Sequence, residues 1–329
     1  MKIFIITEGG RSIGFGHIAR SVSLYQAFEE KGQRPLLLVN GDETAAYILS
    51  GRNFDIVDWM NSKKELFARI AGADIVIVDS YYPDIDFYDR VSKLAKVPVY
   101  MDDNKRVDYS SGVVVNGNIY ANDLQYAGKG SLRYLLGTEY TSLRKPFWDV
   151  PEKSVSGSIA NILVTLGGSE SAELVTMLVG FICKNFPQWE KNVVVGSSFS
   201  YRERVEKVKD GRTHIFHNID EKTMKDLMLG SDIAISSGGQ TLYELARVGV
   251  PVIAISIVDH QLRNIKGLEQ AGILRFAGCS GDGMLPDNVY TAIEYLLPKE
   301  ARSRLSTAGR RLIDGRGSRR IRDIIHEML

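Results

Sequence analysis

The chain has 329 residues, and its 41 Lys and Arg against 40 Asp and Glu leave a formal net charge of +1. Its 44% hydrophobic and 25% charged residues exclude a disordered or collagen-like chain. At roughly 100–200 residues per domain, this length favours two domains.

The same figures exclude several classes of function. No apolar run approaches the roughly 20 residues that span a bilayer, and the near-neutral charge argues against a nucleic-acid binder. Cys183 and Cys279 lie far apart and outside any CxxC, which predicts neither a disulfide framework nor a zinc site. We therefore expect a cytoplasmic protein without stable membrane insertion.

Compact apolar runs alternate with helical patterns through the first half of the chain. Ile18, Val22, Tyr25 and Phe28 recur at helical spacing, and Gly32 ends that helix. Apolar runs of this kind predict buried parallel strands joined by right-handed crossovers. They cover residues 2–7, 36–39, 74–79, 98–101 and 112–115.

The pattern restarts after a polar, Pro- and Ser-containing linker at about 145–158. The later strands are predicted at residues 161–166, 193–195, 213–216, 233–236 and 252–255, with helices at 172–185 and 241–248. Residues 299–329 have a helical, Arg-rich pattern. We predict an α/β fold of two Rossmann-like, doubly wound domains, 1–150 and 151–329, facing one another across a cleft. Ligands of such sheets bind beyond the carboxyl ends of the strands.

The first candidate site follows the opening strand. Gly14 and Gly16 allow a ligand close to the backbone, and amides at the start of the helix favour an anion. His17 is the side chain suited to proton transfer near neutral pH, and Arg20 lies one turn later. From spacing alone, His17 is equally well a polar residue at the start of a helix.

Two further glycine turns belong to the second half. Ser236, Ser237, Gly238, Gly239, Gln240 and Thr241 form a candidate diphosphate nest before a helix. Glu244 is either the capping-box partner of Thr241, which its position slightly favours, or an acceptor for ribose hydroxyls. Gly167, Gly168 and Ser169 are another possible phosphate contact.

Polar residues elsewhere allow more than one interpretation. Asp259, His260, Gln261 and Asn264 suit sugar hydroxyls, or Asp259 caps a surface helix. Asp79, Asp102 and Asp103 lack ligand-like spacing, so we expect structural roles at strand ends and no metal. The arginines of the last segment mix with acids, which favours a solvated face over a nucleic-acid patch. The absence of GK[ST] and GxGxxG argues against a kinase and a dinucleotide oxidoreductase.

The segments IGFGHIARSVSLYQAF, VDSYYPD, VYMDDN, LGTEYTSLRKPF, ILVTLGGSE and SSGGQTLYELARVGVP occur in an order that resembles the PseG/SpsG-like family. The best known activity of that family is UDP-2,4-diacetamido-2,4,6-trideoxy-β-L-altropyranose hydrolase, in pseudaminic acid biosynthesis. The resemblance covers nearly the whole chain. It implies the GT-B fold of the MurG relatives and a role in the synthesis of a nonulosonate or a surface polysaccharide such as that of the spore coat.

Carried onto this chain, the resemblance makes His17 the base that activates water, with Gly14 and Gly16 beside the sugar and phosphate. The substrate-binding residues that we expect are Gly14, Gly16, Arg20, Asp79, Tyr81, Gly168, Ser169, Ile219, Ser237, Gly238, Gly239, Gln240, Thr241, Glu244, His260 and Gln261. Tyr81 would line the sugar pocket, Ser237 to Thr241 would hold the diphosphate, Glu244 the ribose, and the loop at Ile219 the uracil.

Two positions depart from the family pattern. Glu170 stands where Asp is usual, and His260-Gln261 where Asn-Gln is typical. The second departure is closer to glycosyltransferases and leaves transfer to an acceptor open. Hydrolysis of a UDP-linked diacetamido-trideoxy sugar with inversion is the leading hypothesis. A glycosyltransferase and a non-catalytic nucleotide-sugar binding subunit are the alternatives. We expect a monomer that uses no cofactor.

Overall fold

The computed structural model describes residues 1–11, 13–126, 130–167, 172–195 and 199–329. The chain forms two compact units, which we call the first unit, Met1–Lys145 with Gly315–Leu329, and the second unit, Pro146–Asp314. The first boundary lies close to the expected residue 150. Residues 168–171, which include the predicted phosphate contacts Gly168 and Ser169, lie outside the described residues.

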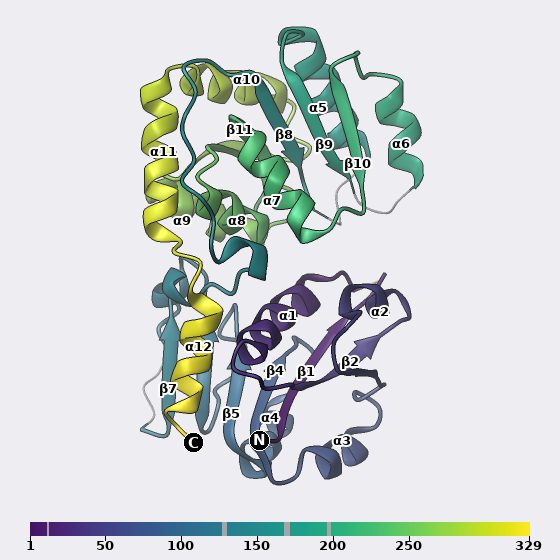
Figure 1. Cartoon of the computed structure of the whole chain (residues 1–329), viewed down its shortest axis with the longest axis vertical. Coiled ribbons are helices and arrows are strands. Elements are labelled where there is room, and N and C mark those ends of the chain that lie inside the picture. Colours follow the sequence, from purple (N-terminus) through teal and green to yellow (C-terminus); the bar gives the residue numbers. More distant parts are fainter. Residues whose placement is uncertain (12, 127–129, 168–171, 196–198) are drawn as a thin grey trace. The chain divides into compact units, whose positions relative to one another are not determined.

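The first unit is built on a parallel sheet that, within the described residues, has seven strands in the order β3-β2-β1-β4-β5-β6-β7 (Figure 1). Its strands are β1 (Ile3–Gly9), β2 (Leu36–Gly41), β3 (Phe54–Ile56), β4 (Ala73–Asp79), β5 (Ala95–Met101), β6 (Gly112–Asn116) and β7 (Leu132–Leu136). Its helices are α1 (Gly16–Glu29), α2 (Thr44–Leu49), α3 (Lys63–Ile70), α4 (Ile85–Leu94) and α12 (Gly317–His326).

The second unit repeats the arrangement with a parallel sheet in the order β10-β9-β8-β11-β12-β13. Its strands are β8 (Asn161–Thr165), β9 (Glu190–Val195), β10 (Thr213–His217), β11 (Ile233–Ser237), β12 (Val252–Ser256) and β13 (Leu274–Cys279). Its helices are α5 (Ala172–Asn185), α6 (Phe199–Glu206), α7 (Glu221–Gly230), α8 (Thr241–Val248), α9 (Gln261–Gln270), α10 (Leu285–Leu296) and α11 (Lys299–Leu312).

Both sheets are doubly wound, which confirms the predicted fold class. Successive side chains of a strand point to opposite faces of its sheet, so a continuous apolar run serves two cores. In β1, Ile3 and Ile5 belong to one buried cluster and Phe4 and Ile6 to the other. Helices cover both faces, and the sequence therefore needs no polar alternation in its central strands.

The last segment of the chain differs from the expectation in two ways. Residues 315–329 were assigned to the second domain, but α12 packs on the first unit because Ile321 and Ile325 complete its core. The arginines were expected on a solvated face, yet Arg302 and Arg322 are 0% and 4% exposed. Arg302 donates to the carbonyls of Leu296 and Ser156 at 2.7 Å each, so it ties segments of the second unit together.

Among the described residues, no helix combines the length and the apolar character needed to cross a membrane.

Candidate active site

Polar side chains gather at the carboxyl ends of neighbouring strands in the first unit. The strand order reverses between β1 and β4, and ligands of doubly wound sheets bind beside such a reversal. Glu8 lies on β1, His17 at the start of α1, and Asp79 at the end of β4. Asp103 follows β5 and Asn118 follows β6. The topology thus brings together residues separated by up to a third of the chain.

The turn between β1 and α1 is compact. Gly10 and Gly14 form an antiparallel bridge in which each backbone N–H donates to the other carbonyl, at 3.0 and 2.8 Å. Gly14 has φ +88°, a left-handed conformation that favours glycine. The N-cap of α1 is Phe15, whose apolar side chain offers no acceptor to the first amides of the helix. The turn therefore delivers His17 to the sheet edge on a helix start that suits an anion.

His17 is paired with Asp79. Its Nδ1 lies 2.6 Å from Oδ1 of Asp79, whose side chain is fully buried. Burial would raise the pKa of Asp79, but the charges of Arg20 and His17 hold it well below its usual range. An ionised carboxylate accepts only, so Nδ1 of neutral His17 carries the proton and Nε2 is the basic nitrogen. Burial lowers the pKa of His17, and the charge and hydrogen bond of Asp79 outweigh it, so the pKa is raised.

Arg20 joins two carboxylates of the sheet edge. Its Nε and Nη2 donate to Asp79 at 2.9 and 2.6 Å, and its Nη1 donates to both oxygens of Asp103 at 2.7 and 2.9 Å. We predicted Arg20 and Asp79 as substrate contacts. The structure directs the guanidinium fork to internal partners and leaves the Asp79 side chain 0% exposed, so Asp79 contacts His17 and Arg20 and not the solvent. The substrate contact of Arg20, whose side chain is 16% exposed, stays a prediction.

Tyr81, which the resemblance predicts to line the sugar pocket, lies beside His17. Its ring stands edge-on to His17, with centroids 4.5 Å apart, and the residue is 43% exposed. Its hydroxyl donates to Asp103, which also accepts from Nδ2 of Asn118 at 2.8 Å. Burial and the neighbouring Asp103 raise the pKa of the Tyr81 phenol, so it remains a protonated donor.

Glu8 is a site residue that sequence reasoning missed. It ends an apolar strand as a single acid, and no spacing marks it. Its side chain is only 2% exposed, and Oε1 lies 3.8 Å from Nε2 of His17. Burial raises the pKa of Glu8, and hydrogen bonds from Ser80 and Tyr81 oppose that rise. The basic face of His17 is therefore lined by a second carboxyl group.

The second unit has a corresponding turn after β11. The hydroxyl of Ser237, the last residue of β11, donates to the carbonyl of Leu166, directly after β8, at 2.6 Å, which joins the two strand ends at the strand-order reversal. The backbone N–H of Gly238 donates to Oε1 of Gln261 at 3.3 Å, and that oxygen also accepts from the N–H of Ile257 at 3.0 Å. Gln261 was predicted as a substrate contact, but its carbonyl oxygen is engaged within the unit.

Asn264 has an internal role as well. It is 6% exposed, its Nδ2 donates to the carbonyl of Gly238 at 2.9 Å, and its Oδ1 accepts from the hydroxyl of Tyr243. Both polar atoms of its side chain are thus engaged in hydrogen bonds that stabilise the Gly238 turn. We therefore assign Asn264 a structural role in place of the suggested contact with sugar hydroxyls. His260, not Asp259, is the N-cap of α9, and its side chain is exposed.

The capping box proposed for Thr241 and Glu244 is wrong. The N-cap of α8 is Gln240, which makes no side-chain cap hydrogen bond, so Thr241 is already the first helical residue. A capping box needs the hydroxyl at the N-cap and the acid three residues later. Glu244 is 1% exposed, and its predicted ribose contact stays a prediction. Ile219 lies after β10, beyond the left-handed Asn218 with φ +48°.

Close packing requires glycine at position 238 of this turn but does not require it at position 239. A Cβ on Gly238 would lie 2.6 Å from Cβ of Gln261 and 2.9 Å from Cδ1 of Ile265. We expect Gly238→Ala to lower the free energy of unfolding by about 1–3 kcal/mol, because α9 must move. Gly239→Ala is the control, since no atom lies within 4 Å of its added Cβ among the described residues. Thermal unfolding of both variants checks this, and equal melting temperatures would contradict it.

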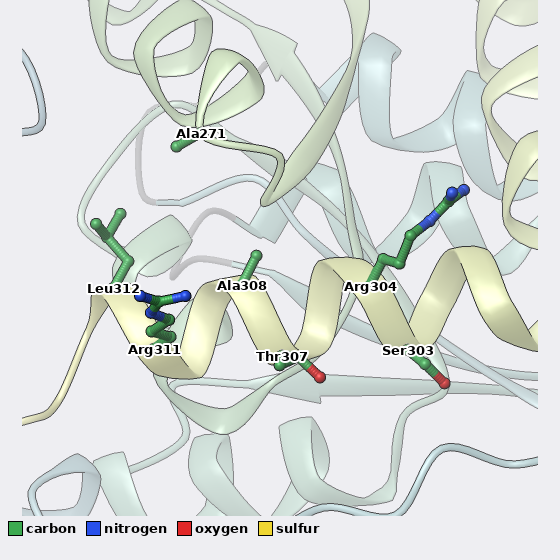
Figure 2. A pocket seen from close by; sticks show the side chains of 7 residues that line it. All are labelled: Ala271, Ser303, Arg304, Thr307, Ala308, Arg311 and Leu312. Carbon is green, nitrogen blue, oxygen red and sulfur yellow. The ribbon is translucent and has the colours of Figure 1, made fainter.

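A surface pocket of about 680 Å³ lies elsewhere on the second unit. Figure 2 shows its lining along α11, with Ala271 across from the helix. Ala271 is the C-cap of α9, three residues before β13 begins, so it lies toward the amino-terminal edge of the sheet, opposite the glycine turns. We therefore assign this pocket no part in the candidate site.

Residues 161–279 match the glycosyltransferase family 28 C-terminal domain. The chain is 24% identical to the spore coat polysaccharide biosynthesis protein SpsG of Bacillus subtilis, over 100% of this chain and 98% of that protein. It is 26% identical to the uncharacterized protein MJ1062 of Methanocaldococcus jannaschii, over 78% of this chain and 55% of that protein.

A third relative is a bifunctional protein of Helicobacter pylori, described as pseudaminic acid cytidylyltransferase and UDP-2,4-diacetamido-2,4,6-trideoxy-beta-L-altropyranose hydrolase. Identity to it is 23%, over 84% of this chain and 48% of that protein. The chain thus spans about half the length of the archaeal and Helicobacter relatives.

Solved structures share the fold at low identity. The UDP complex of Staphylococcus aureus MnaA is similar with a TM-score of 0.72 and 15% identity, over 100% of this chain and 98% of that one. MurG of Acinetobacter baumannii is similar with a TM-score of 0.67 and 14% identity, over 99% and 100%. The fold is therefore of the GT-B type, and the matches together support the resemblance to PseG/SpsG-like proteins.

Proposed function

We propose, for a chain similar to PseG/SpsG-like proteins of the GT-B fold, that it hydrolyses a UDP-linked diacetamido-trideoxy sugar at the anomeric carbon. The products would be UDP and the free sugar. The sugar class is taken from the Helicobacter relative, whose description includes that hydrolase activity. The synthesis of pseudaminic acid, or of a related nonulosonate or surface polysaccharide, is the corresponding biological role.

The observation that carries this proposal is the pairing of His17 with Asp79. The 2.6 Å contact at Nδ1 fixes the ring and its tautomer, so Nε2 is presented as the base. The same logic orients the histidine of hydrolytic triads, in which a buried carboxylate also stabilises the imidazolium that forms. The exposed ring of Tyr81 beside His17 supplies a flat, amphipathic surface on which a sugar can pack.

The chemical step follows from these roles. Water forms the new bond to the anomeric carbon and gives a proton to Nε2 of His17, while the bond to the diphosphate oxygen breaks with its electron pair. The transition state has oxocarbenium character, and negative charge grows on UDP. The amide of Gly239 and the N-terminus of α8 are the groups we assign to that charge, since the N–H of Gly238 donates to Gln261. Direct displacement inverts the anomeric centre.

A glycosyltransferase is the second candidate. It is favoured by His260-Gln261 and by the match of residues 161–279 to a glycosyltransferase domain. The two reactions differ only in whether water or an acceptor hydroxyl receives the help of His17.

The decisive experiment incubates the protein with UDP-2,4-diacetamido-2,4,6-trideoxy-β-L-altropyranose, with and without mono- and disaccharide acceptors. NMR follows UDP release and the first-formed anomer of the sugar. We expect release without acceptor and an inverted anomer. Release only in the presence of an acceptor would establish transfer, and binding without turnover would establish a nucleotide-sugar binding subunit.

A further inference from the structure

The carboxyl group of Glu8 is held rigidly beside the basic nitrogen of His17. Its Oε1 accepts the backbone N–H of Tyr81 at 3.1 Å, and its Oε2 accepts the hydroxyl of Ser80. Oγ of Ser80 in turn accepts a hydrogen bond from the backbone N–H of Tyr82, with an N–O distance of 3.1 Å. A carboxylate oxygen offers two lone-pair directions, so Oε1 can accept a second hydrogen bond besides that of Tyr81.

Oε1 of Glu8 and Nε2 of His17 are 3.8 Å apart, beyond a direct hydrogen bond. One oxygen atom at about 2.8 Å from each is compatible with that separation, through slightly bent hydrogen bonds. Both atoms are acceptors when His17 is neutral and Glu8 ionised. The position between them therefore suits a molecule that donates two hydrogen bonds from one oxygen.

We propose that Glu8 is a catalytic residue that binds the nucleophilic water together with His17 and thereby selects water over an alcohol. This inference rests on the proposed hydrolase function. One proton of the water points to His17 Nε2 and the other to Glu8 Oε1, which turns a lone pair toward the anomeric carbon. As the carbon–oxygen bond forms, the first proton passes to His17, the second stays on the new hydroxyl, and UDP leaves with the electron pair.

An alcohol lacks the second proton. Bound in the same place, it donates one hydrogen bond to His17 and none to Oε1 of Glu8, which then keeps only the hydrogen bond from the N–H of Tyr81. A hydrogen bond to a charged group contributes about 1.5–3 kcal/mol, which corresponds to roughly a tenfold to hundredfold preference for water. The pair formed by Glu8 and His17 would thus favour hydrolysis over transfer of the sugar to an alcohol acceptor.

The test compares Glu8→Met, which keeps the volume and removes the acceptor, with Glu8→Gln, which keeps a neutral acceptor oxygen. Each protein is given the diacetamido UDP-sugar in buffer with methanol, and NMR measures the ratio of methyl glycoside to free sugar. We expect the rate of hydrolysis to fall about ten- to hundredfold in Glu8→Met and by a smaller factor in Glu8→Gln. The ratio of methyl glycoside to free sugar should rise in both variants, and more in Glu8→Met. If Glu8→Met does not fold, the ratio in Glu8→Gln decides.

Asp42→Asn is the matched control. The carboxylate of Asp42, just after β2, accepts the backbone N–H of Arg11 in the β1–α1 turn at 2.9 Å. Loss of that carboxylate therefore perturbs the turn without touching the Glu8–His17 pair. Its product ratio should equal that of the wild type. If the Glu8 variants slow both nucleophiles equally, Glu8 only holds the Ser80–Tyr81 turn and the inference is wrong, although hydrolysis stands. A wild type that releases no UDP without an acceptor sugar overturns the proposed function, and the inference with it.

Discussion

Replacing His17 by alanine is expected to lower kcat for UDP-sugar hydrolysis by about 10²–10⁴-fold, the usual contribution of a general base. The affinity for UDP should not change, because the diphosphate is assigned to the turn after β11. That turn is held by Gln261 and Asn264 within the second unit. Steady-state kinetics and calorimetric titration of UDP provide the two measurements.

His214→Ala serves as the matched control for that experiment. His214 is exposed on β10 and pairs with Glu190 at 3.0 Å, so its loss removes an imidazole from the surface only. We expect its kcat to equal that of the wild type. An unchanged kcat in His17→Ala would remove His17 from the role of base, and a parallel loss of UDP affinity would show that the variant damages the fold.

Asp79→Asn should have an effect of similar size, about 10³–10⁴-fold on kcat, because an amide disturbs the tautomer of the histidine. Oδ1 accepts from His17 and from Nη2 of Arg20, while Oδ2 accepts from Nε of Arg20. The side-chain amide of asparagine has only one acceptor oxygen to replace the two carboxylate oxygens. In either orientation of the amide, its NH₂ group faces an N–H donor of His17 or of Arg20, where it cannot accept a hydrogen bond.

The same substitution predicts a shift in pH dependence. The base form of His17 is present only above its pKa, which Asp79 raises from the ordinary value of 6.5 despite burial. The acid limb of kcat/KM in the wild type should therefore have its midpoint above 6.5. In Asp79→Asn the midpoint should move to lower pH, since the charge and hydrogen bond that raise the pKa are lost.

Asp103→Asn is the control for the pH shift. It takes a carboxylate from Arg20 but removes no bond to His17, so the acid limb should stay closer to that of the wild type. Equal shifts in both variants would mean that the summed negative charge of the sheet edge, and not the Asp79 contact, sets the pKa of His17.

The central strands could be predicted from the sequence, whereas three edge strands could not. β1, β4 and β11 are buried on both faces and appear as continuous apolar runs. β3, β7 and β13 lie at sheet edges, where solvent tolerates polar side chains such as Asp55, Arg133 and Arg275. Edge strands are often short and carry charges that discourage further pairing, which weakens the apolar pattern of these three. The fourth edge strand, β10, was nevertheless predicted, at residues 213–216.

The sequence singled out His17, Arg20, Asp79 and Tyr81 as candidate site residues, but it did not predict the contacts that they make with one another. His17 was singled out because two glycines precede it at the start of a helix. Glu8 and Asp103 become informative only when the sheet order brings β1, β4 and β5 side by side. The structural role of Asn264 was similarly hidden, because sequence spacing cannot distinguish an amide that binds a ligand from one that holds a turn.

The return of the last residues to the first unit affects the order in which the protein can fold during synthesis. The second unit is one unbroken stretch, Pro146–Asp314, and all of it leaves the ribosome before α12 does. The first unit begins earlier but lacks Ile321 and Ile325 in its core until α12 has been synthesised. Domains usually mature from the N-terminus onward. In this chain the half that carries the proposed base reaches its native packing last.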